Sequence, residues 1–239
     1  MIELVLNPTN THLHQIETWL IDERNQYNEG FYCNWNNVSN HFDNKELFCL
    51  VEHEQVIGFV CWRIYEKTVH LEIVEIMRPK RGSGLGRMMV EESLEVFKKK
   101  GALVADIECS PAESEPVWRK LGFIAYQKNE YITNPTKFKP LIPYQELLTD
   151  SDTNSNGLKV ELWNGEPWET RKLPPNWSWV VSYKTNTKEL EQPIIYPANH
   201  NWRIRLSQGE KMLYDEKIKH RKDVDTIHFG SFLIIREIA

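Results

Sequence analysis

Residues 81 to 87 read Arg-Gly-Ser-Gly-Leu-Gly-Arg and lie between two different patterns. An extended apolar stretch over residues 68–77 precedes them, and residues 85–100 follow with apolar side chains at helical spacing. This order predicts a strand, a glycine turn and the first turn of a helix. The first N–H groups of a helix have no intrahelical partner and carry the positive end of its dipole. Glycine reaches positive φ without strain and has no Cβ that would keep a phosphate away. The run therefore predicts an anion-binding turn, with phosphate as the favoured ligand.

The glycine spacing narrows the class of site. A nucleoside-triphosphatase loop needs Lys followed by Ser or Thr after its last glycine, where this chain has Arg87 and Met88. A dinucleotide-binding loop needs the spacing GxGxxG, whereas residues 82–86 read GxGxG. Taken alone, the run also fits an ordinary glycine turn that caps a helix.

Both flanks of the turn carry further signals. The strand before it ends His-Leu-Glu-Ile-Val-Glu-Ile-Met-Arg-Pro-Lys over residues 70–80. A second predicted strand leads to Trp-Arg-Lys-Leu-Gly-Phe at residues 118–123. Together with Arg-x-x-Gly-x-Gly at 81–86, these stretches resemble the GCN5-related N-acetyltransferase (GNAT) superfamily over about residues 1–140. The resemblance implies an α/β fold with a mixed, splayed sheet flanked by helices.

Residue periodicity predicts the elements of that fold. Apolar positions at helical spacing predict helices over residues 11–27 and 85–100. Three consecutive strands are expected to form an antiparallel meander before the glycine turn. The predicted strands of this part are residues 1–7, 46–51, 56–65, 68–77, 103–110, 124–128 and 131–138.

The chain changes character after residue 148. Residues 149–157 contain no apolar side chain, and this predicts a linker between a GNAT domain over 1–145 and a second domain over 158–239. The second domain resembles no family and is expected to be mostly β, with five of the nine tryptophans (Trp163, Trp168, Trp177, Trp179 and Trp202). Its predicted strands are residues 158–163, 178–184, 193–196, 202–206, 211–217 and 231–238.

Composition bounds the class of protein. A chain of 239 residues with 41% hydrophobic residues can bury a full core, and we expect a cytoplasmic protein without a membrane span or secretory signal. Residues 158–239 carry 13 Lys/Arg and 11 Asp/Glu, which leaves a net charge of −7 on residues 1–157. An acidic catalytic part favours a cationic acceptor over a nucleic acid, although a need for solubility explains the negative charge equally well.

The four cysteines lack CxxC spacing, so buried free thiols are favoured over a metal site or disulfides.

The resemblance implies that acetyl-coenzyme A is the co-substrate. In the family the thioester lies along the strand before the glycine turn, and the pyrophosphate lies on the turn itself. Trp118 stands where the family usually has a tyrosine beside the coenzyme. The residues expected to bind the coenzyme are Val74, Glu75, Ile76, Arg81, Gly82, Ser83, Gly84, Leu85, Gly86, Arg87 and Trp118.

His70 and Glu72 are the candidate general bases. They lie at i and i+2 of one strand, hence on one face, and match positions where family members carry a catalytic His or Glu. The alternative is that both residues only form a solvent-exposed face of the strand and take no part in catalysis. The same alternation places Glu75 on the opposite face, where a structural role is favoured. An indole cannot give up a proton at neutral pH, so Trp118 leaves the general acid open between Tyr126, Tyr65 and solvent.

The predicted function is the transfer of an acetyl group from acetyl-coenzyme A to an amine by direct attack. The sequence does not identify the acceptor, which could be a small molecule or a peptide. The acceptor site is expected to be lined by Tyr27, Phe31, Tyr32 and Trp35, each of which could instead be part of the core. A homodimer is possible. The alternative function is a non-catalytic module that binds acyl-coenzyme A or another protein.

Overall fold

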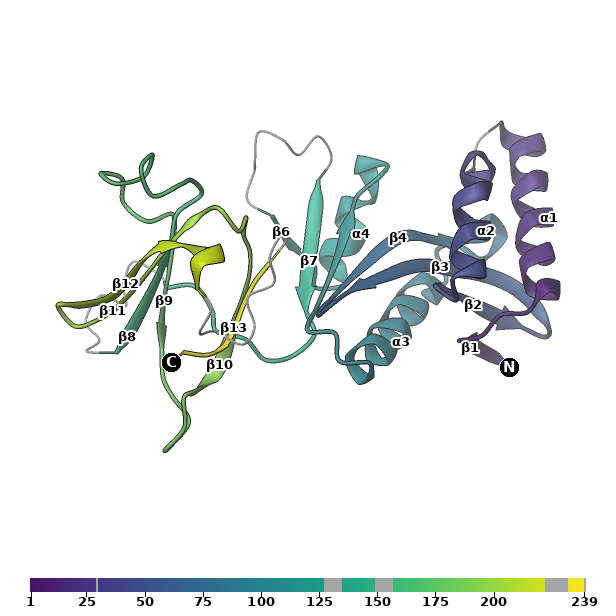
Figure 1. Cartoon of the computed structure of the whole chain (residues 1–239). Coiled ribbons are helices and arrows are strands. Elements are labelled where there is room, and N and C mark those ends of the chain that lie inside the picture. Colours follow the sequence, from purple (N-terminus) through teal and green to yellow (C-terminus); the bar gives the residue numbers. More distant parts are fainter. Residues whose placement is uncertain (29, 127–134, 149–156, 222–231, 239) are drawn as a thin grey trace. The chain divides into compact units, whose positions relative to one another are not determined.

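The computed structural model describes residues 1–28, 30–126, 135–148, 157–221 and 232–238, which form two compact units, Met1–Leu141 and Ile142–Ala239 (Figure 1). The predicted linker over 149–157 lies outside the described residues except for Gly157. The domain limits at 145 and 158 therefore stay a prediction. Within the described residues, no helix is long and apolar enough to cross a membrane.

A seven-stranded mixed sheet organises the first unit. Its first four strands pair in sequence order as an antiparallel meander, whereas β4 and β5 pair in parallel. The strand order is β1-β2-β3-β4-β5-β7-β6. Their bounds are β1 Ile2–Val5, β2 Leu47–Glu52, β3 Gln55–Tyr65, β4 Thr68–Ile76, β5 Val104–Glu108, β6 Ile124–Ala125 and β7 Thr136–Pro140. Residues 131–134 of the predicted strand over 131–138 lie outside the described residues, and the rest of it overlaps β7.

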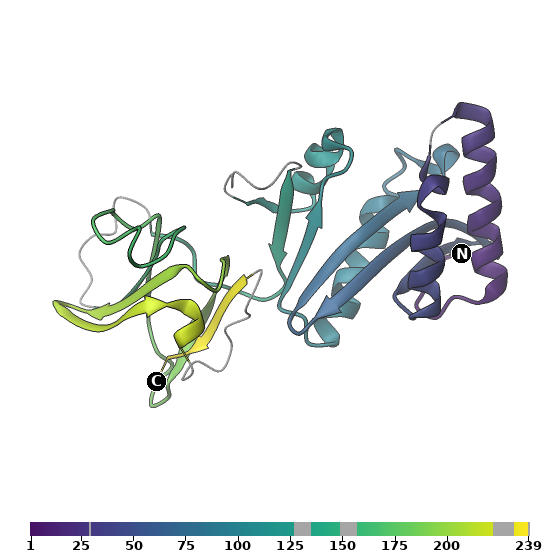
Figure 2. The same cartoon turned by 45° about the horizontal axis from the view of Figure 1, so that its top comes forward.

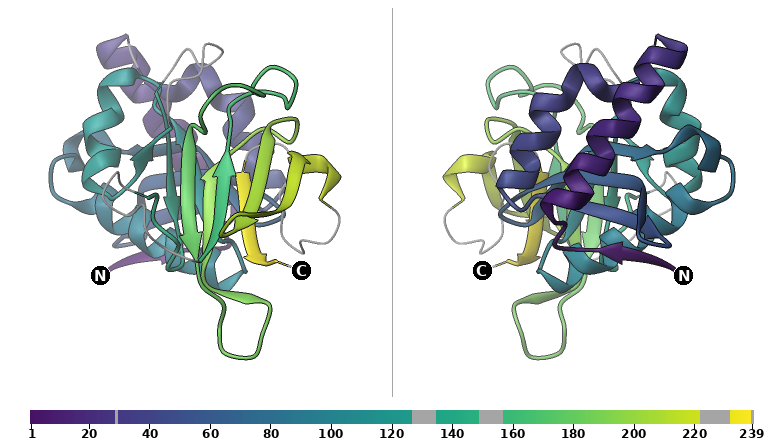
Figure 3. Two further views of the ribbon diagram at one scale, coloured as in Figure 1. Left: turned by 90° about the vertical axis from the view of Figure 1, so that its left-hand side faces the viewer. Right: turned by 90° about the vertical axis from the view of Figure 1, so that its right-hand side faces the viewer.

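Helices cover both faces of this sheet. The helix α1 (Asn10–Tyr27) begins after the N-cap Thr9, and it covers one face together with α2 (Trp35–Asp43), as the right-hand view of Figure 3 shows. The other face carries α3 (Leu85–Lys99) and α4 (Glu115–Lys120). Both cores are apolar: Ile16, Leu20 and Val38 pack on Phe59 and Ile73, whereas Met89, Leu94 and Phe97 pack on Phe48 and Leu71. Short 3-10 turns occur at Phe31–Asn34, Arg78–Lys80 and Ala112–Ser114.

Three of the four cysteines are buried free thiols. Cys49 and Cys61 lie in β2 and β3, and Cys109 follows β5. Burial raises the pKa of the Cys49 thiol to about 12, which makes it a poor nucleophile. Cys33 is exposed, because it lies in the 3-10 turn after α1 rather than in a strand.

The second unit is built from strands. One sheet has the order β12-β11-β8-β9, and a second pairs β10 with β13. Side chains of both sheets, including Val160, Ile204, Ile194 and Leu233, join in one apolar core. The bounds are β8 Leu158–Leu162, β9 Trp177–Val181, β10 Glu189–Pro197, β11 Arg203–Gln208, β12 Lys211–Lys217 and β13 Phe232–Glu237, with a 3-10 turn at Ile218–His220.

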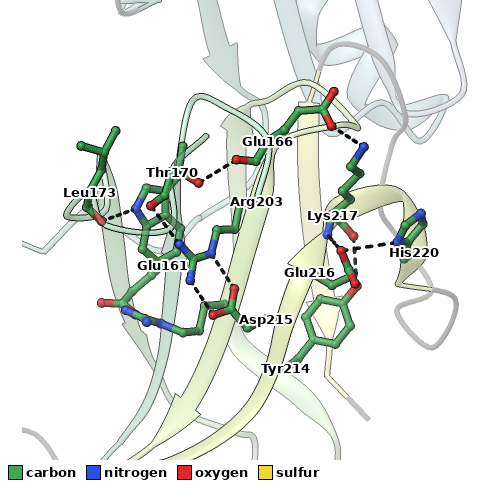
Figure 4. A network of polar contacts seen from close by, with 12 residues as sticks. Glu161, Glu166, Thr170, Leu173, Arg203, Tyr214, Asp215, Glu216, Lys217 and His220 are labelled. Atoms are coloured by element: carbon green, nitrogen blue, oxygen red, sulfur yellow. Dashed lines mark hydrogen bonds and ion pairs between the residues drawn. The ribbon is translucent and has the colours of Figure 1, made fainter. Parts of the chain in front are cut away.

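Arginine and tryptophan side chains fix the irregular segment between β8 and β9 (Figure 4). Arg203 donates to both carboxylate oxygens of Asp215 at 2.6 Å and to the carbonyl of Thr170 at 3.0 Å. Its guanidinium carbon lies 4.3 Å from the ring centroid of the buried Trp163, whose indole N–H donates to the Leu173 carbonyl. Of the tryptophans in this unit, only Trp168 is largely exposed, so most of them bury the unit's own apolar surface.

Candidate active site

The strands β4 and β5 separate in the middle of the sheet. Their parallel pairing covers four residue pairs and ends at Leu71 and Ile107, although β4 continues to Ile76 (Figure 2). Figures 1 and 2 both show the blue strands diverging from the teal ones beyond this point. Among the described residues, no strand therefore pairs with β4 beyond Leu71 on the side that faces β5.

Two residues turn their backbone groups into this gap. The Met77 N–H donates to the Ile57 carbonyl on β3, so by antiparallel alternation Ile76 and Val74 point their groups away from β3. The backbone groups of Ile76 form hydrogen bonds with side chains. Its N–H donates to the Glu75 carboxylate at 3.1 Å, and its carbonyl accepts from Arg81 Nε at 2.7 Å. The backbone of Val74 faces the same gap, and its contact with a thioester stays a prediction.

The glycine turn lies directly after this strand. Gly82 and Gly84 have φ of +78° and +86°, and a Cβ placed on either would meet nothing within 4 Å. Gly84 is the N-cap of α3, so the free N–H groups of its first turn follow at once. Open space beside these N–H groups and the positive end of the helix dipole fit an anion such as a pyrophosphate.

Arg81 anchors this turn to the sheet. Its guanidinium lies 2.6 Å from the Glu75 carboxylate and 3.6 Å from that of the buried Glu23 on α1. Burial and the charge of Glu23 raise the pKa of Glu75, against the opposing effects of Arg81 and the Ile76 N–H. Contact of Arg81 with the coenzyme stays a prediction, as does contact of Arg87, which pairs with Glu91 in the next helical turn.

A β-bulge overturns the predicted orientation of Glu75. Cys61 pairs with Ile73 and Trp62 with Leu71, which leaves Glu72 as an extra residue in β4. An extra residue shifts the alternation of all side chains that follow it. Glu75 therefore reaches Arg81 and Glu23 on the α1 and α2 face, the face on which Glu72 contacts His41 of α2. The prediction of an opposite face was wrong because the bulge is invisible in the local pattern.

His70 forms a close pair with Asp106 of β5. His70 Nδ1 lies 2.8 Å from Asp106 Oδ1, and Tyr126 donates its hydroxyl to Asp106 Oδ2 at 3.3 Å. Burial lowers the pKa of His70, but the hydrogen bond and charge of Asp106, with Glu72 and Glu108, raise it above its ordinary value overall. Burial and the Asp106 carboxylate raise the pKa of Tyr126, which weakens it as a proton donor.

Glu72 lies in a different polar network. Its Oε2 lies 2.9 Å from Nε2 of the fully buried His41 and accepts from the Asn37 amide at 3.3 Å, while Oε1 lies 3.4 Å from Arg63. Burial raises the pKa of Glu72, but these neighbours together lower it below its ordinary value. A carboxylate with a lowered pKa is a weak proton acceptor.

The remaining predicted residues lie largely in packing positions. Trp118 is buried against Phe123, with ring centroids 5.2 Å apart. Phe31, Tyr32 and Trp35 are partly buried against the core under α1 and α2. A coenzyme or acceptor contact for these residues stays a prediction.

Tyr27 is half exposed, and the Arg78 guanidinium lies 4.4 Å from its ring centroid. Both residues line a cleft of about 340 Å³ that α1 forms with residues 55–56 and 77–79. Of the four predicted acceptor residues, this cleft includes Tyr27 alone.

The sequence model of the acetyltransferase (GNAT) family matches residues 11–123, which contain the splayed strands and the glycine turn. This match identifies residues 11–123, within the N-terminal unit, as a GNAT acetyltransferase domain. No curated protein matches the chain.

Solved GNAT structures are similar to part of this chain at low sequence identity. PaiA N-acetyltransferase from Thermoplasma acidophilum in complex with coenzyme A is 16% identical at a TM-score of 0.47, covering 59% of this chain and 99% of that protein. A GNAT acetyltransferase from Staphylococcus aureus is 10% identical at a TM-score of 0.48, covering 59% and 100%. The ribosomal-protein-S18-alanine N-acetyltransferase from Escherichia coli is 13% identical at a TM-score of 0.46, covering 65% and 100%.

Three residues of the site were not predicted from the sequence. Asp106 holds His70, His41 holds Glu72, and Glu23 approaches Arg81. Each comes from an element distant in sequence from its partner. A charged residue inside an apolar strand, as at Asp106, was the one local signal that could have directed attention to it.

Proposed function

We propose that the GNAT unit transfers the acetyl group of acetyl-coenzyme A to an amine, with His70 as the general base. The observation that carries the proposal is the position of His70 on β4, next to Leu71, the last residue paired with β5. The glycine turn lies at the far end of the same gap. A coenzyme with its pyrophosphate on that turn and its pantetheine along β4 would bring the thioester toward His70.

Different residues bind the coenzyme and transfer the protons. The backbone of Val74 hydrogen-bonds the pantetheine and thioester, and the N–H groups of the glycine turn hold the pyrophosphate. Nε2 of His70 takes a proton from the acceptor ammonium, the freed amine attacks the thioester carbonyl carbon, and the C–S bond breaks. The new amide nitrogen gives its second proton to solvent. The departing thiolate takes a proton from solvent, because Tyr126 binds its own proton too tightly.

His70 suits the role of base better than Glu72. The imidazole side chain is about one-third exposed and its pKa is raised above the ordinary value, whereas His41, Asn37 and Arg63 surround Glu72. Glu72 keeps its negative charge near the reacting centre, and this charge favours a cationic acceptor. The acceptor class we propose is therefore an amine that is protonated before it reacts.

Turnover with a panel of polyamines, amino acids, peptides and aminoglycosides tests this function. Release of the coenzyme A thiol is followed with and without each amine, and the signal is corrected for the exposed thiol of Cys33. His70→Gln should lower turnover by about a hundred- to ten-thousandfold without changing acetyl-coenzyme A affinity in calorimetry. His220→Gln, at an exposed histidine of the other unit, is the matched control. Tight coenzyme binding with no acetylated product from any amine would replace this proposal by the non-catalytic module.

A further inference from the structure

We propose that Asp106 is a positioning residue that holds the imidazole proton of His70 on Nδ1 and so makes Nε2 the proton acceptor. The inference deepens the function proposed above and rests on it for the reaction that Nε2 serves. Its geometric part, the orientation and protonation of the ring, is independent of that reaction.

The sheet places the two side chains beside each other. His70 and Asp106 are direct partners in the short parallel ladder between β4 and β5, and Nδ1 and Oδ1 are 2.8 Å apart. Asp106 is 9% exposed, so its carboxylate has little contact with water. Its second oxygen accepts the Tyr126 hydroxyl, so both oxygens are engaged and the carboxylate is held in one orientation.

This contact fixes which nitrogen carries the proton. An ionised carboxylate only accepts hydrogen bonds, so the nitrogen that faces Asp106 must donate. A neutral imidazole has a single N–H, and with that proton on Nδ1 the lone pair lies on Nε2. When Nε2 takes a proton from the acceptor ammonium, the imidazolium that forms stands beside the negative charge of Asp106. The proton on Nδ1 stays in place during this step, and the imidazolium later returns the proton on Nε2 to solvent.

Several charged or titratable groups surround His70, so the contribution of Asp106 has to be separated from theirs. They are Asp106 and Glu108 from β5, Glu72 from β4, Arg63 from β3 and Tyr126 after β6. In the described part of the chain, Asp106 alone hydrogen-bonds the ring. Removal of its charge should therefore lower the pKa of His70, whereas removal of the exposed Glu108 charge should change it much less.

Nitrogen-15 NMR of the full chain tests the ring directly, with the His70 signals assigned by comparison with His70→Gln. At a pH above its pKa, wild-type His70 should show the spectrum of the Nδ1–H tautomer. In Asp106→Asn the pKa of His70 should fall, and the tautomer should no longer be fixed because an amide can donate as well as accept. Glu108→Gln is the matched control and should keep both the tautomer and most of the pKa.

Turnover measurements distinguish a failure of this inference from a failure of the proposed function. With an amine that the wild type acetylates, Asp106→Asn should lower kcat by about a hundredfold and move the rising limb of the pH profile to lower pH, with the KM for acetyl-coenzyme A unchanged. A merely structural role would lower stability and leave that limb in place. An Nε2–H tautomer in the wild type, or an unchanged His70 pKa in Asp106→Asn, overturns the inference. If the NMR results are as expected but the wild type acetylates no amine, the proposed function fails, and with it the role of Nε2 as acceptor.

Discussion

Gly84 offers a sharp test of the coenzyme site because its conformation and its surroundings can be tested apart. It is the N-cap of α3 with φ of +86°, and a Cβ there would extend into space with no atom within 4 Å. An alanine in this left-handed conformation costs about 1–2 kcal/mol of strain. Its methyl group would also occupy the space where we expect the coenzyme pyrophosphate.

The loss of affinity can be estimated from the hydrogen bonds involved. A hydrogen bond from an N–H to a charged group contributes about 1.5–3 kcal/mol. If the methyl group moves the pyrophosphate away from one N–H of the turn, the Kd for acetyl-coenzyme A should rise about 10- to 150-fold. The strain should lower the melting temperature of both the free and the bound protein by roughly 2–8 °C.

Gly101 provides the matched control for this change. It follows the other end of α3 with φ of +90°, and a Cβ there also meets nothing within 4 Å. Gly101→Ala should lose comparable stability and keep the wild-type Kd in isothermal titration calorimetry. Equal affinities in the Gly84→Ala variant and the wild type, or equal losses in both variants, would refute the assignment of the turn to the pyrophosphate.

Three further predictions concern Glu72, Trp35 and the second unit. Because folding lowers the pKa of Glu72, the stability it contributes should be present above its unfolded pKa of about 4.3 and be lost as pH falls through the folded value. In denaturant titrations, Glu72→Gln should therefore lower the free energy of unfolding at pH 7 but not at acid pH, and an equal loss at both pH values would contradict this. Trp35→Ala should raise the KM for the acceptor and leave the Kd for acetyl-coenzyme A unchanged, whereas a change in melting temperature alone would assign Trp35 to the core. A chain of residues 1–152 tests the role of the second unit: acetyl-coenzyme A binding with lost acceptor turnover would assign that unit to acceptor recognition, and unchanged turnover would give it a structural role.

The elements of the first unit were predictable because their patterns are local. The glycine turn, the helical spacing over 85–100 and the three consecutive strands each lie within one stretch of sequence, and the structure has α3 over Leu85–Lys99 and the meander β2, β3 and β4. In the second unit, β10 begins at Glu189 rather than at 193, because Glu189 pairs across an irregular register with Glu237. Such pairing depends on a distant strand and leaves no local signal.

The side-chain partners of the site were much less predictable. His70 and Glu72 were selected by their place before the turn, but what distinguishes them are their neighbours Asp106 and His41. The register between β4 and β5 brings Asp106 to His70, and the packing of α2 brings His41 to Glu72. The face of Glu75 was wrong for a related reason, since one extra residue in β4 reverses the alternation.

A crystal structure with acetyl-coenzyme A would show whether the gap between β4 and β5 is the acetyl-transfer site. The pyrophosphate should lie against the N–H groups of residues 82–87, and the thioester carbonyl should lie within hydrogen-bonding distance of the Val74 backbone. Nε2 of His70 should face the side from which an amine would attack. A coenzyme bound elsewhere on the chain, with the gap beyond Leu71 left to water, would contradict this assignment.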